Sequence, residues 1–265
     1  QNLPKEEVDR RVMDVAQRLR IDHLLRKRPG RLPGGEQQRV ALGRAMVRQP
    51  QVFLMDEPLT NLDASLRTDM RAELKRLQQE LATTMVYVTH DQIEAMSMSH
   101  RIAVLNLGVL QQVDTPLNIY RYPSTLFVAT FIGSPPMNIV TCHVEDGVLH
   151  DESGDFHYTL PDTLRDAVTG VSGVYFGIRS EDISLVLDDD TTADLQGEIL
   201  IREPMGDETI YLVQVGSHKL SVKAPPRLVL ERGEAVSLKI NPARLHLFDQ
   251  QSEQSLIRRE AMVHG

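Results

Sequence analysis

The hydrophobic pattern of this chain changes near Phe131, and that change limits the folds open to it. Before Phe131, segments with helical spacing alternate with short apolar runs, whereas after it short strand-like runs follow one another between Gly, Pro, Asp and Asn. Alternating strands and helices indicate a parallel sheet covered on both faces, and closely spaced short strands indicate a small barrel or sandwich. The 265 residues suffice for one large or two modest domains.

The first half of the chain carries the helical signals. Apolar residues recur at helical spacing after Pro4, and Asp63 is a suitable N-cap for a long amphipathic helix. The run Val52–Met55 is wholly apolar and lies between Pro50 and two acids, which predicts a buried parallel strand. We expect helices over 4–19, 36–48, 63–81 and 91–98, strands over 52–55 and 84–88, and a hairpin of 102–105 with 109–113.

The second half predicts a β-rich domain. The residues Ile132–Pro136 combine Gly, Ser and two prolines and mark a boundary, and the chain becomes polar after Gln250. We therefore expect domains over 1–133 and 134–250 and a polar tail over 251–265. The expected strands are 139–144, 174–178, 197–201, 209–215, 218–222, 235–240 and 244–248.

Composition excludes several classes of protein. The net charge of −8 disfavours non-specific binding to nucleic acid, which needs clustered cations. The single cysteine, Cys142, cannot form an internal disulfide, so we expect it to be a small core residue. No apolar run approaches the roughly 18 residues that span a bilayer, and the start of the chain shows no signal-peptide pattern. Because it opens with Gln1 rather than Met, we interpret the chain as cut from a longer one.

Two acids close the apolar run, in the stretch Phe53-Leu54-Met55-Asp56-Glu57-Pro58. Carboxylates at the edge of a buried strand cost desolvation free energy, so this placement is unusual. One interpretation is a strand end with two solvated acids. The other is triphosphate hydrolysis, in which one carboxylate serves Mg²⁺ through water and its neighbour polarises an attacking water.

Other segments strengthen the second interpretation. The paired glycines of Leu32-Pro33-Gly34-Gly35-Glu36 open a helix, where backbone N–H groups can approach a phosphate, although a plain glycine-rich turn has the same appearance. His90 follows the strand at 84–88 and could reach a phosphate oxygen from its end, or it could be structural. These segments, in this order around Asp56 and Glu57, favour a nucleotide site.

Taken together, the motifs resemble those of the ATP-binding subunits of ATP-binding-cassette (ABC) transporters. Residues 32–39 resemble the signature motif, 53–57 the Walker B strand, 61–63 the D-loop and His90 the switch histidine. The stretches 87–96 and 131–138 are similar to the carbohydrate-importer branch, of the maltose and glycerol-3-phosphate type. Residues 177–183 and 241–249 resemble its C-terminal regulatory domain, an OB-like barrel.

The resemblance implies a fold, a set of site residues and ligands. The fold is α/β, a partial P-loop NTPase domain with a helical subdomain over 1–133, followed by a β-rich OB-like regulatory domain. The ligands are ATP and Mg²⁺. The implied roles are catalysis for Glu57 and His90, Mg²⁺ binding through water for Asp56, binding of ATP in trans for Leu32, Pro33, Gly34, Gly35 and Glu36, and dimer communication for Asn61, Leu62 and Asp63.

The resemblance also implies a function and partners. The function is that of an ATPase energising import of a sugar or sugar phosphate, at the cytoplasmic face of the cell membrane as a peripheral protein. The partners are an identical or paralogous ATPase subunit, transmembrane permease subunits and, indirectly, an extracytoplasmic solute-binding protein, with no nucleic acid.

The chain departs from the family pattern in two ways. It has no Gly-x-x-x-x-Gly-Lys-Ser/Thr phosphate loop, which in the family precedes the part that begins here, so we expect the chain alone neither to hold nor to hydrolyse ATP efficiently. Pro33 replaces the serine of the signature, and Glu36 stands where glutamine is usual, which puts the trans contact to ATP in question.

Two other classes of function stay open at this point. A non-hydrolytic remnant or regulatory protein that keeps the dimerising barrel would explain the absent loop and Pro33, but not the retained Asp56, Glu57 and His90. A nucleic-acid-binding barrel has little support, because the second half shows no basic patch with interleaved aromatic residues.

Overall fold

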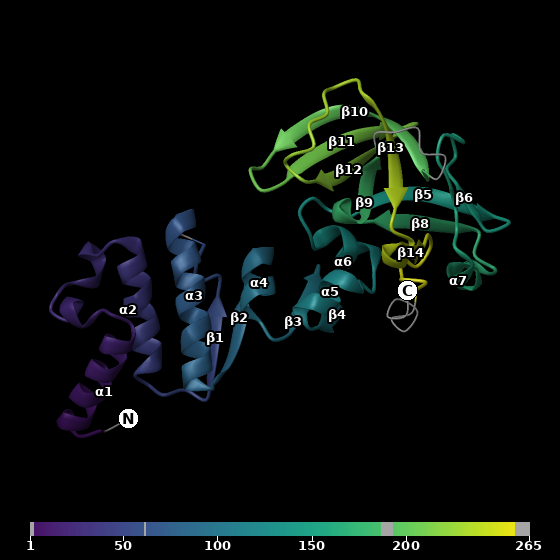
Figure 1. Ribbon diagram of the computed structural model, residues 1–265. Coiled ribbons are helices and arrows are strands. Elements are labelled where there is room, and N and C mark those ends of the chain that lie inside the picture. The colour runs from purple at the N-terminus through teal and green to yellow at the C-terminus, as the bar shows by residue number, and fades with distance from the viewer. Residues whose placement is uncertain (1–2, 61, 187–192, 258–265) are drawn as a thin grey trace. The chain divides into compact units, whose positions relative to one another are not determined.

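The computed structural model describes residues 3–60, 62–186 and 193–257, and the chain divides into two compact units (Figure 1). The first unit comprises residues 1–99 and the second residues 100–265. This compact division falls at a different place from the domain limit expected after residue 133, which remains a prediction. Among the described residues, no helix combines the length and the apolar character needed to cross a membrane.

The first unit contains the predicted helices and strands, each within two residues of its expected limits. They are α1 (Lys5–Arg18), the short 3-10 turns η1 (Asp22–Leu24) and η2 (Pro29–Arg31), α2 (Gly34–Met46), β1 (Val52–Asp56), α3 (Ala64–Leu81), β2 (Thr84–Val88) and α4 (Gln92–Met98). Asp63 caps α3 by accepting a hydrogen bond from the Leu66 N–H at 2.8 Å, as its residue type predicts.

Strands β1 and β2 pair in parallel, and α3 runs beside them (Figure 1). The prediction that the run 52–55 is buried throughout is wrong. Phe53 is buried, but Leu54 is 80% exposed and Val52 is 47% exposed. The physical reason is that successive side chains of a strand point to opposite faces. Phe53 and Met55 face the cluster that includes α2 and α3, whereas Val52 and Leu54 point to the other face, which the described residues leave open.

Buried side chains of the first unit join its helices to β1. One cluster brings Leu19, the residue that follows α1, together with Met46 of α2, Leu77 of α3 and Phe53 of β1. A second cluster places Leu59 and Leu62, in the segment after β1, against Met70 and Leu74 of α3. The loop that follows the two acids is therefore held by the long helix.

The second unit opens with the predicted hairpin, β3 (Ile102–Asn106) with β4 (Val109–Asp114), and two short helices, α5 (Pro116–Arg121) and α6 (Leu126–Phe131). Two five-stranded antiparallel sheets follow, in the orders β12-β11-β10-β13-β9 and β14-β8-β5-β6-β7. Their elements are β5 (Asn138–Glu145), β6 (Val148–His150), β7 (His157–Thr159), α7 (Asp162–Arg165), η3 (Asp166–Val168), β8 (Gly173–Ile178), η4 (Ser180–Asp182), β9 (Ile183–Val186), β10 (Leu195–Pro204), β11 (Thr209–Val215), β12 (His218–Ala224), β13 (Ala235–Ile240), η5 (Pro242–Arg244) and β14 (His246–Asp249).

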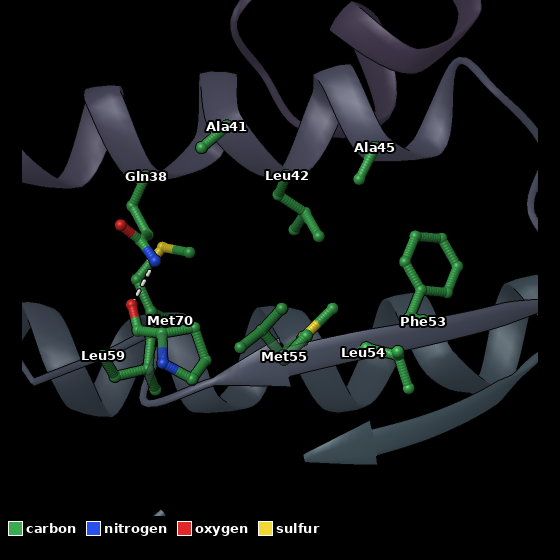
Figure 2. Close-up of a pocket in the computed structure, with 11 residues that line it drawn as sticks. Gln38, Ala41, Leu42, Ala45, Phe53, Leu54, Met55, Leu59 and Met70 are labelled. Carbon is green, nitrogen blue, oxygen red and sulfur yellow. Dashed lines mark hydrogen bonds between the residues drawn. The ribbon is translucent and has the colours of Figure 1, made fainter. Parts of the chain in front are cut away.

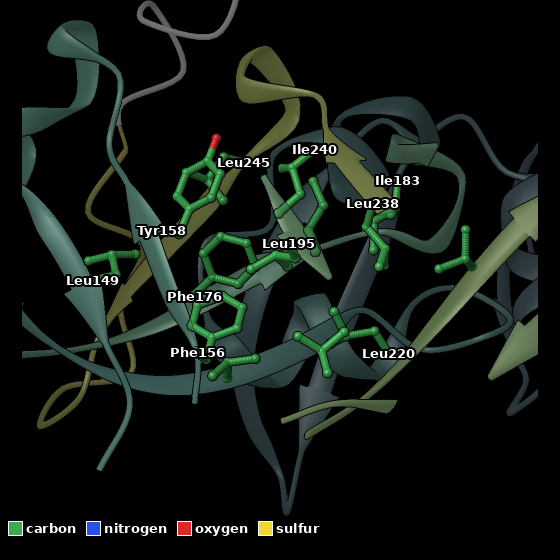
Figure 3. Packing of buried hydrophobic residues seen from close by; sticks show 14 of the residues in the cluster. Leu149, Phe156, Tyr158, Phe176, Ile183, Leu195, Leu220, Leu238, Ile240 and Leu245 are labelled. Carbon is green, nitrogen blue, oxygen red and sulfur yellow. The ribbon is translucent and has the colours of Figure 1, made fainter. Parts of the chain in front are cut away.

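The inner faces of the two sheets share one apolar core (Figure 3). Phe176 of β8 meets Phe156 with ring centroids 5.1 Å apart, and Leu220 and Leu238 enter the same cluster from the other sheet. This arrangement agrees with the predicted barrel or sandwich, although β6, β7 and β9 were not expected. Cys142 is buried in this core, where burial raises the pKa of its thiol to about 12, as expected of a structural cysteine.

Candidate functional site

The carboxyl ends of β1 and β2 bring the predicted catalytic residues to one edge of the strand pair. Asp56, the last residue of β1, lies opposite Val88, the last residue of β2. The N–H of Glu57 donates to the Val88 carbonyl at 2.9 Å, so it extends the pairing by one step. His90 follows two residues after Val88. Parallel pairing thus places the acid pair and the histidine side by side.

Glu57 makes direct contact with His90. The Glu57 Oε1 atom lies 2.9 Å from His90 Nδ1, and Thr60 Oγ1 donates to Glu57 Oε2 at 3.1 Å. The backbone of Glu57 has a φ of 43°, a left-handed conformation that is uncommon outside glycine and costs of order 1–3 kcal/mol. Strained backbone of this kind concentrates at functional sites, which agrees with a special role for this carboxylate.

The contact shifts the pKa values of Glu57 and His90 in the directions that favour an ion pair between them. The hydrogen bond from His90, followed by that from Thr60, lowers the pKa of Glu57 below its ordinary value. The same bond to Glu57 raises the pKa of His90. The pair is therefore ionised at pH values between the lowered pKa of Glu57 and the raised pKa of His90, and it is lost as the pH rises through the latter.

This pairing predicts a titration result for the His90 imidazole. Replacing Glu57 by Gln removes the anion while leaving a similar side chain, so the pKa of His90 should fall toward the ordinary imidazole value of about 6.5. The measurement is an NMR pH titration of the histidine ring signals, with His90 assigned from a His90→Gln variant. A His90 pKa that does not change in Glu57→Gln would contradict the contact.

Asp56 differs from Glu57 in its surroundings. Its carboxylate is exposed at the end of β1, and within the described ranges no hydrogen bond or ion pair joins it to another residue. Mg²⁺ prefers oxygen ligands, keeps several waters and binds through one or two carboxylates together with substrate phosphates. A single accessible carboxylate at the strand end therefore fits the metal implied by the sequence motif.

The glycine-rich segment begins α2 and packs on the start of α3. Gly34 is the first residue of the helix and Pro33 is its N-cap, which supplies no side-chain acceptor. A Cβ atom on Gly35 would lie 2.6 Å from a methyl group of Leu66, so glycine permits the close packing at this point. Leu32 is buried, and Glu36 lies half-buried in the first turn.

A hydrogen bond connects α2 to the segment after the acid pair. Gln38 donates its Nε2–H to the Pro58 carbonyl, across an apolar cavity of about 200 Å³ lined by α2, β1 and α3 (Figure 2). Leu62, in the segment that resembles a D-loop, is buried, and one of its methyl groups lies 3.8 Å from the position of a Cβ on Gly34. Asp63 serves as the cap of α3, whereas Asn61 lies outside the described residues.

The sequence did not identify the residues that support the site. Thr60 holds the second oxygen of Glu57, and Glu94, which is only 3% exposed, accepts hydrogen bonds from Tyr87 at 2.9 Å and Thr89 at 2.7 Å. The spacing of Asp91 and Glu94 is that of a helix N-cap and its N3 acid, a signal that marks the helix start but not these contacts.

Comparison with known families and proteins gives a consistent picture. The family model for ABC transporters matches residues 1–60, that for the MalK OB fold domain matches 133–183, and that for the TOBE domain matches 176–248. The match to the xylose/arabinose import ATP-binding protein XacK of Haloferax volcanii is 45% identical and covers 97% of this chain and 68% of that protein.

Two further relatives have related names. The trehalose/maltose import ATP-binding protein MalK of Thermococcus litoralis is 46% identical over 93% of this chain and 68% of that protein. The sn-glycerol-3-phosphate import ATP-binding protein UgpC of Psychromonas ingrahamii is 42% identical over 93% of this chain and 66% of that protein.

The matches confirm the predicted fold class, an ABC ATPase portion followed by an OB-like β-domain. The chain belongs to the family of ATP-binding subunits of ABC transporters. The resemblance to the carbohydrate-importer branch, drawn from the motifs, is confirmed as well. Nucleotide binding follows from membership of this family.

Proposed function

We propose that the chain belongs to the ATP-hydrolysing subunit that energises import of a sugar or sugar phosphate, and that hydrolysis also needs a phosphate loop, which its sequence does not contain. The observation that carries this proposal is the contact of Glu57 with His90 at the carboxyl ends of β1 and β2, beside the exposed carboxylate of Asp56. The names of the relatives support the solute class, since they refer to import of xylose and arabinose, trehalose and maltose, or sn-glycerol 3-phosphate.

Each residue of the strand edge has a role in this proposal. Asp56 holds Mg²⁺ through water, and the metal, when bound, neutralises charge on the phosphates. Glu57, whose pKa is lowered by His90 and Thr60, stays ionised at neutral pH and polarises the attacking water. His90 donates to the γ-phosphate, a role that its raised pKa favours because the cationic imidazole attracts an anion.

Further residues serve a dimer. In the proposal, residues 32–36 at the start of α2 face the nucleotide of a second ATPase subunit, identical or paralogous, and Asn61, Leu62 and Asp63 connect the two sites. Closure of the dimer pulls on transmembrane permease subunits, and a solute-binding protein delivers the solute on the other side. The subunit then works as a peripheral protein at the cytoplasmic face of the membrane.

The alternative of a non-hydrolytic remnant is not favoured. The relatives that match over more than nine-tenths of the chain carry the names of import ATP-binding proteins. The Glu57–His90 contact at the strand edge also supports an intact site. Pro33 remains a departure from the signature, because it removes a hydroxyl and an N–H that could bind phosphate.

The proposal is tested by solute uptake in the organism that carries the gene. A deletion strain is complemented with the wild-type gene or the Glu57→Gln variant, and uptake of radiolabelled xylose, maltose, trehalose and sn-glycerol 3-phosphate is measured. We expect the deletion to abolish uptake of at least one of them, with rescue by the wild type and not by the variant. Unchanged uptake of all four solutes in the deletion strain would contradict the proposed class.

A further inference from the structure

One arginine, Arg67 of α3, lies between the two loops that follow β1 and β2. Its Nη2 donates to the carbonyl oxygen of Leu62 at 3.1 Å, and its Nη1 lies 3.5 Å from the Oδ2 atom of Asp91. Leu62 belongs to the loop that begins at Glu57, and Asp91 directly follows His90. A single guanidinium thus joins the segments that carry the two partners of the Glu57–His90 contact.

The Asp91 end of this bridge is held firmly. Asp91 Oδ1 caps α4 by accepting from the N–H groups of Ile93 at 2.8 Å and Glu94 at 3.2 Å. The Asp91 N–H donates to Thr89 Oγ1 at 3.0 Å, and Thr89 in turn donates to the buried Glu94 at 2.7 Å. The backbone on both sides of His90 is therefore anchored, so a displacement of Asp91 is transmitted to the imidazole.

The Leu62 end is equally constrained. Leu62 is buried against Met70 and Leu74 of α3, and the next residue, Asp63, caps that helix. The Arg67 guanidinium bonds the Leu62 carbonyl, and the Arg67 N–H donates to the Asp63 carbonyl at 2.9 Å. Helix α3 is capped by Asp63 of the loop after β1, and its Arg67 contacts Asp91 of the loop after β2. Both loops are therefore fixed to the same helix.

We infer that Arg67 is a positioning residue that fixes the spacing of these two loops and so seats His90 against Glu57. The guanidinium suits this task because it is planar and presents separate donors in a fixed fork, whereas an ammonium is a point charge on a flexible stem. The Arg67–Asp91 ion pair is partly buried but long, at 3.5 Å. We expect so long a pair to contribute little to stability by itself, so the bridge matters through geometry. The inference rests on the proposed function for its link to ATP turnover, because His90 is assigned its phosphate contact there.

The variant Arg67→Lys tests the inference, because it keeps the positive charge and removes the fork. The measured quantity is the pKa of the His90 ring in the 265-residue chain, obtained from an NMR pH titration. It is compared with the pKa of His90 in the Glu57→Gln variant. We expect Arg67→Lys to lower the pKa of His90, and we expect this decrease to be more than half of the decrease that Glu57→Gln produces. This titration contains no ATP, so its failure would contradict the positioning role of Arg67 alone. Failure of the transport assay would instead contradict the proposed function.

A second variant separates geometry from charge. In Arg67→Met the loss of a nearby cation, and the release of Asp91 from its ion pair, would each raise the pKa of His90 if charge alone mattered. Loss of the Glu57 contact lowers it. A fall in Arg67→Met therefore supports positioning, whereas a rise, or a value equal to the wild type in both Arg67 variants, overturns it.

A matched control lies one turn further along the same helix. Arg71 donates to Thr68 Oγ1 at 3.0 Å, so Arg71→Met removes a cation from α3 and leaves the bridge intact. We expect the His90 pKa to change far less in Arg71→Met than in Arg67→Lys. Circular dichroism confirms that each variant folds. In the assembled transporter, Arg67→Lys should lower kcat with little change in KM for ATP, and an effect on KM alone would contradict the positioning role.

Discussion

The Glu57→Gln substitution is expected to slow ATP hydrolysis by the assembled transporter by about 100- to 10,000-fold, the range that a positioned general base contributes. Gln keeps the shape of the side chain and can still contact His90 and Thr60, but it cannot accept a proton from water. The loss should therefore fall on kcat, because the substitution removes an interaction made mainly in the transition state. The measurement is release of inorganic phosphate under saturating ATP.

A control carboxylate distinguishes this effect from a general change of charge. Asp69 lies exposed on α3 in the same unit, and Asp69→Asn removes the same charge without touching the strand edge. We expect Asp69→Asn to retain the turnover of the wild type. Binding of a fluorescent ATP analogue should persist in Glu57→Gln, and turnover at the wild-type rate in that variant would rule out Glu57 as the base.

The candidate site could be predicted because its residues directly follow strands that the sequence itself predicts. Asp56 and Glu57 follow one predicted strand and His90 follows the next, and parallel strands bring such ends to one edge. The left-handed backbone of Glu57 and its bond to Thr60 could not be predicted in the same way. They depend on how the chain turns after Asp56, for which a run of residue types contains no direct signal.

The burial of the β1 residues shows a second limit of prediction from the sequence. A run of apolar residues predicts a strand, but it does not say which neighbours cover each face, so Phe53 and Leu54 had the same expectation and opposite outcomes. In the β-rich unit the missed strands β6 and β7 are only three residues long. So short a segment cannot display a period of two, and its pairing partners decide its structure.

Arg179 connects the short helices of the second unit to its sheets, although sequence analysis placed it only within a family motif. Arg179 precedes η4 in the β-rich region and is only 3% exposed. Its Nη1 donates to the Ile132 carbonyl at 2.8 Å and its Nη2 to the Tyr120 carbonyl at 2.7 Å, while its guanidinium carbon lies 3.7 Å from the centre of the Tyr120 ring. These contacts join α5 and the end of α6 to the sheets.

The buried guanidinium is costly on its own and is compensated by these partners. Burial lowers the pKa of Arg179 below its ordinary value, and Tyr120 donates its hydroxyl to Glu181 beside it. Among the described residues the buried Nε of Arg179 has no hydrogen-bond partner, so compensation of the buried charge depends on the two bonds from its Nη groups. Both carbonyl acceptors of Arg179 precede the predicted domain limit after residue 133, and they lie in the same compact unit as Arg179.

Replacing Arg179 by Met is therefore expected to lower the free energy of unfolding of the second unit by about 3 kcal/mol, since two buried carbonyls lose charged donors and each such loss costs about 1–3 kcal/mol. Equilibrium denaturation followed by circular dichroism measures the change. The control is Arg202→Met, which removes a single ion pair with the exposed Glu231 and should cost less than about 1 kcal/mol. Equal losses in the two variants would show that Arg179 does not hold α5 and α6 to the sheets. A larger loss in Arg179→Met, with earlier proteolytic cleavage between residues 115 and 136, would show that this side chain holds α5 and α6 to the sheets.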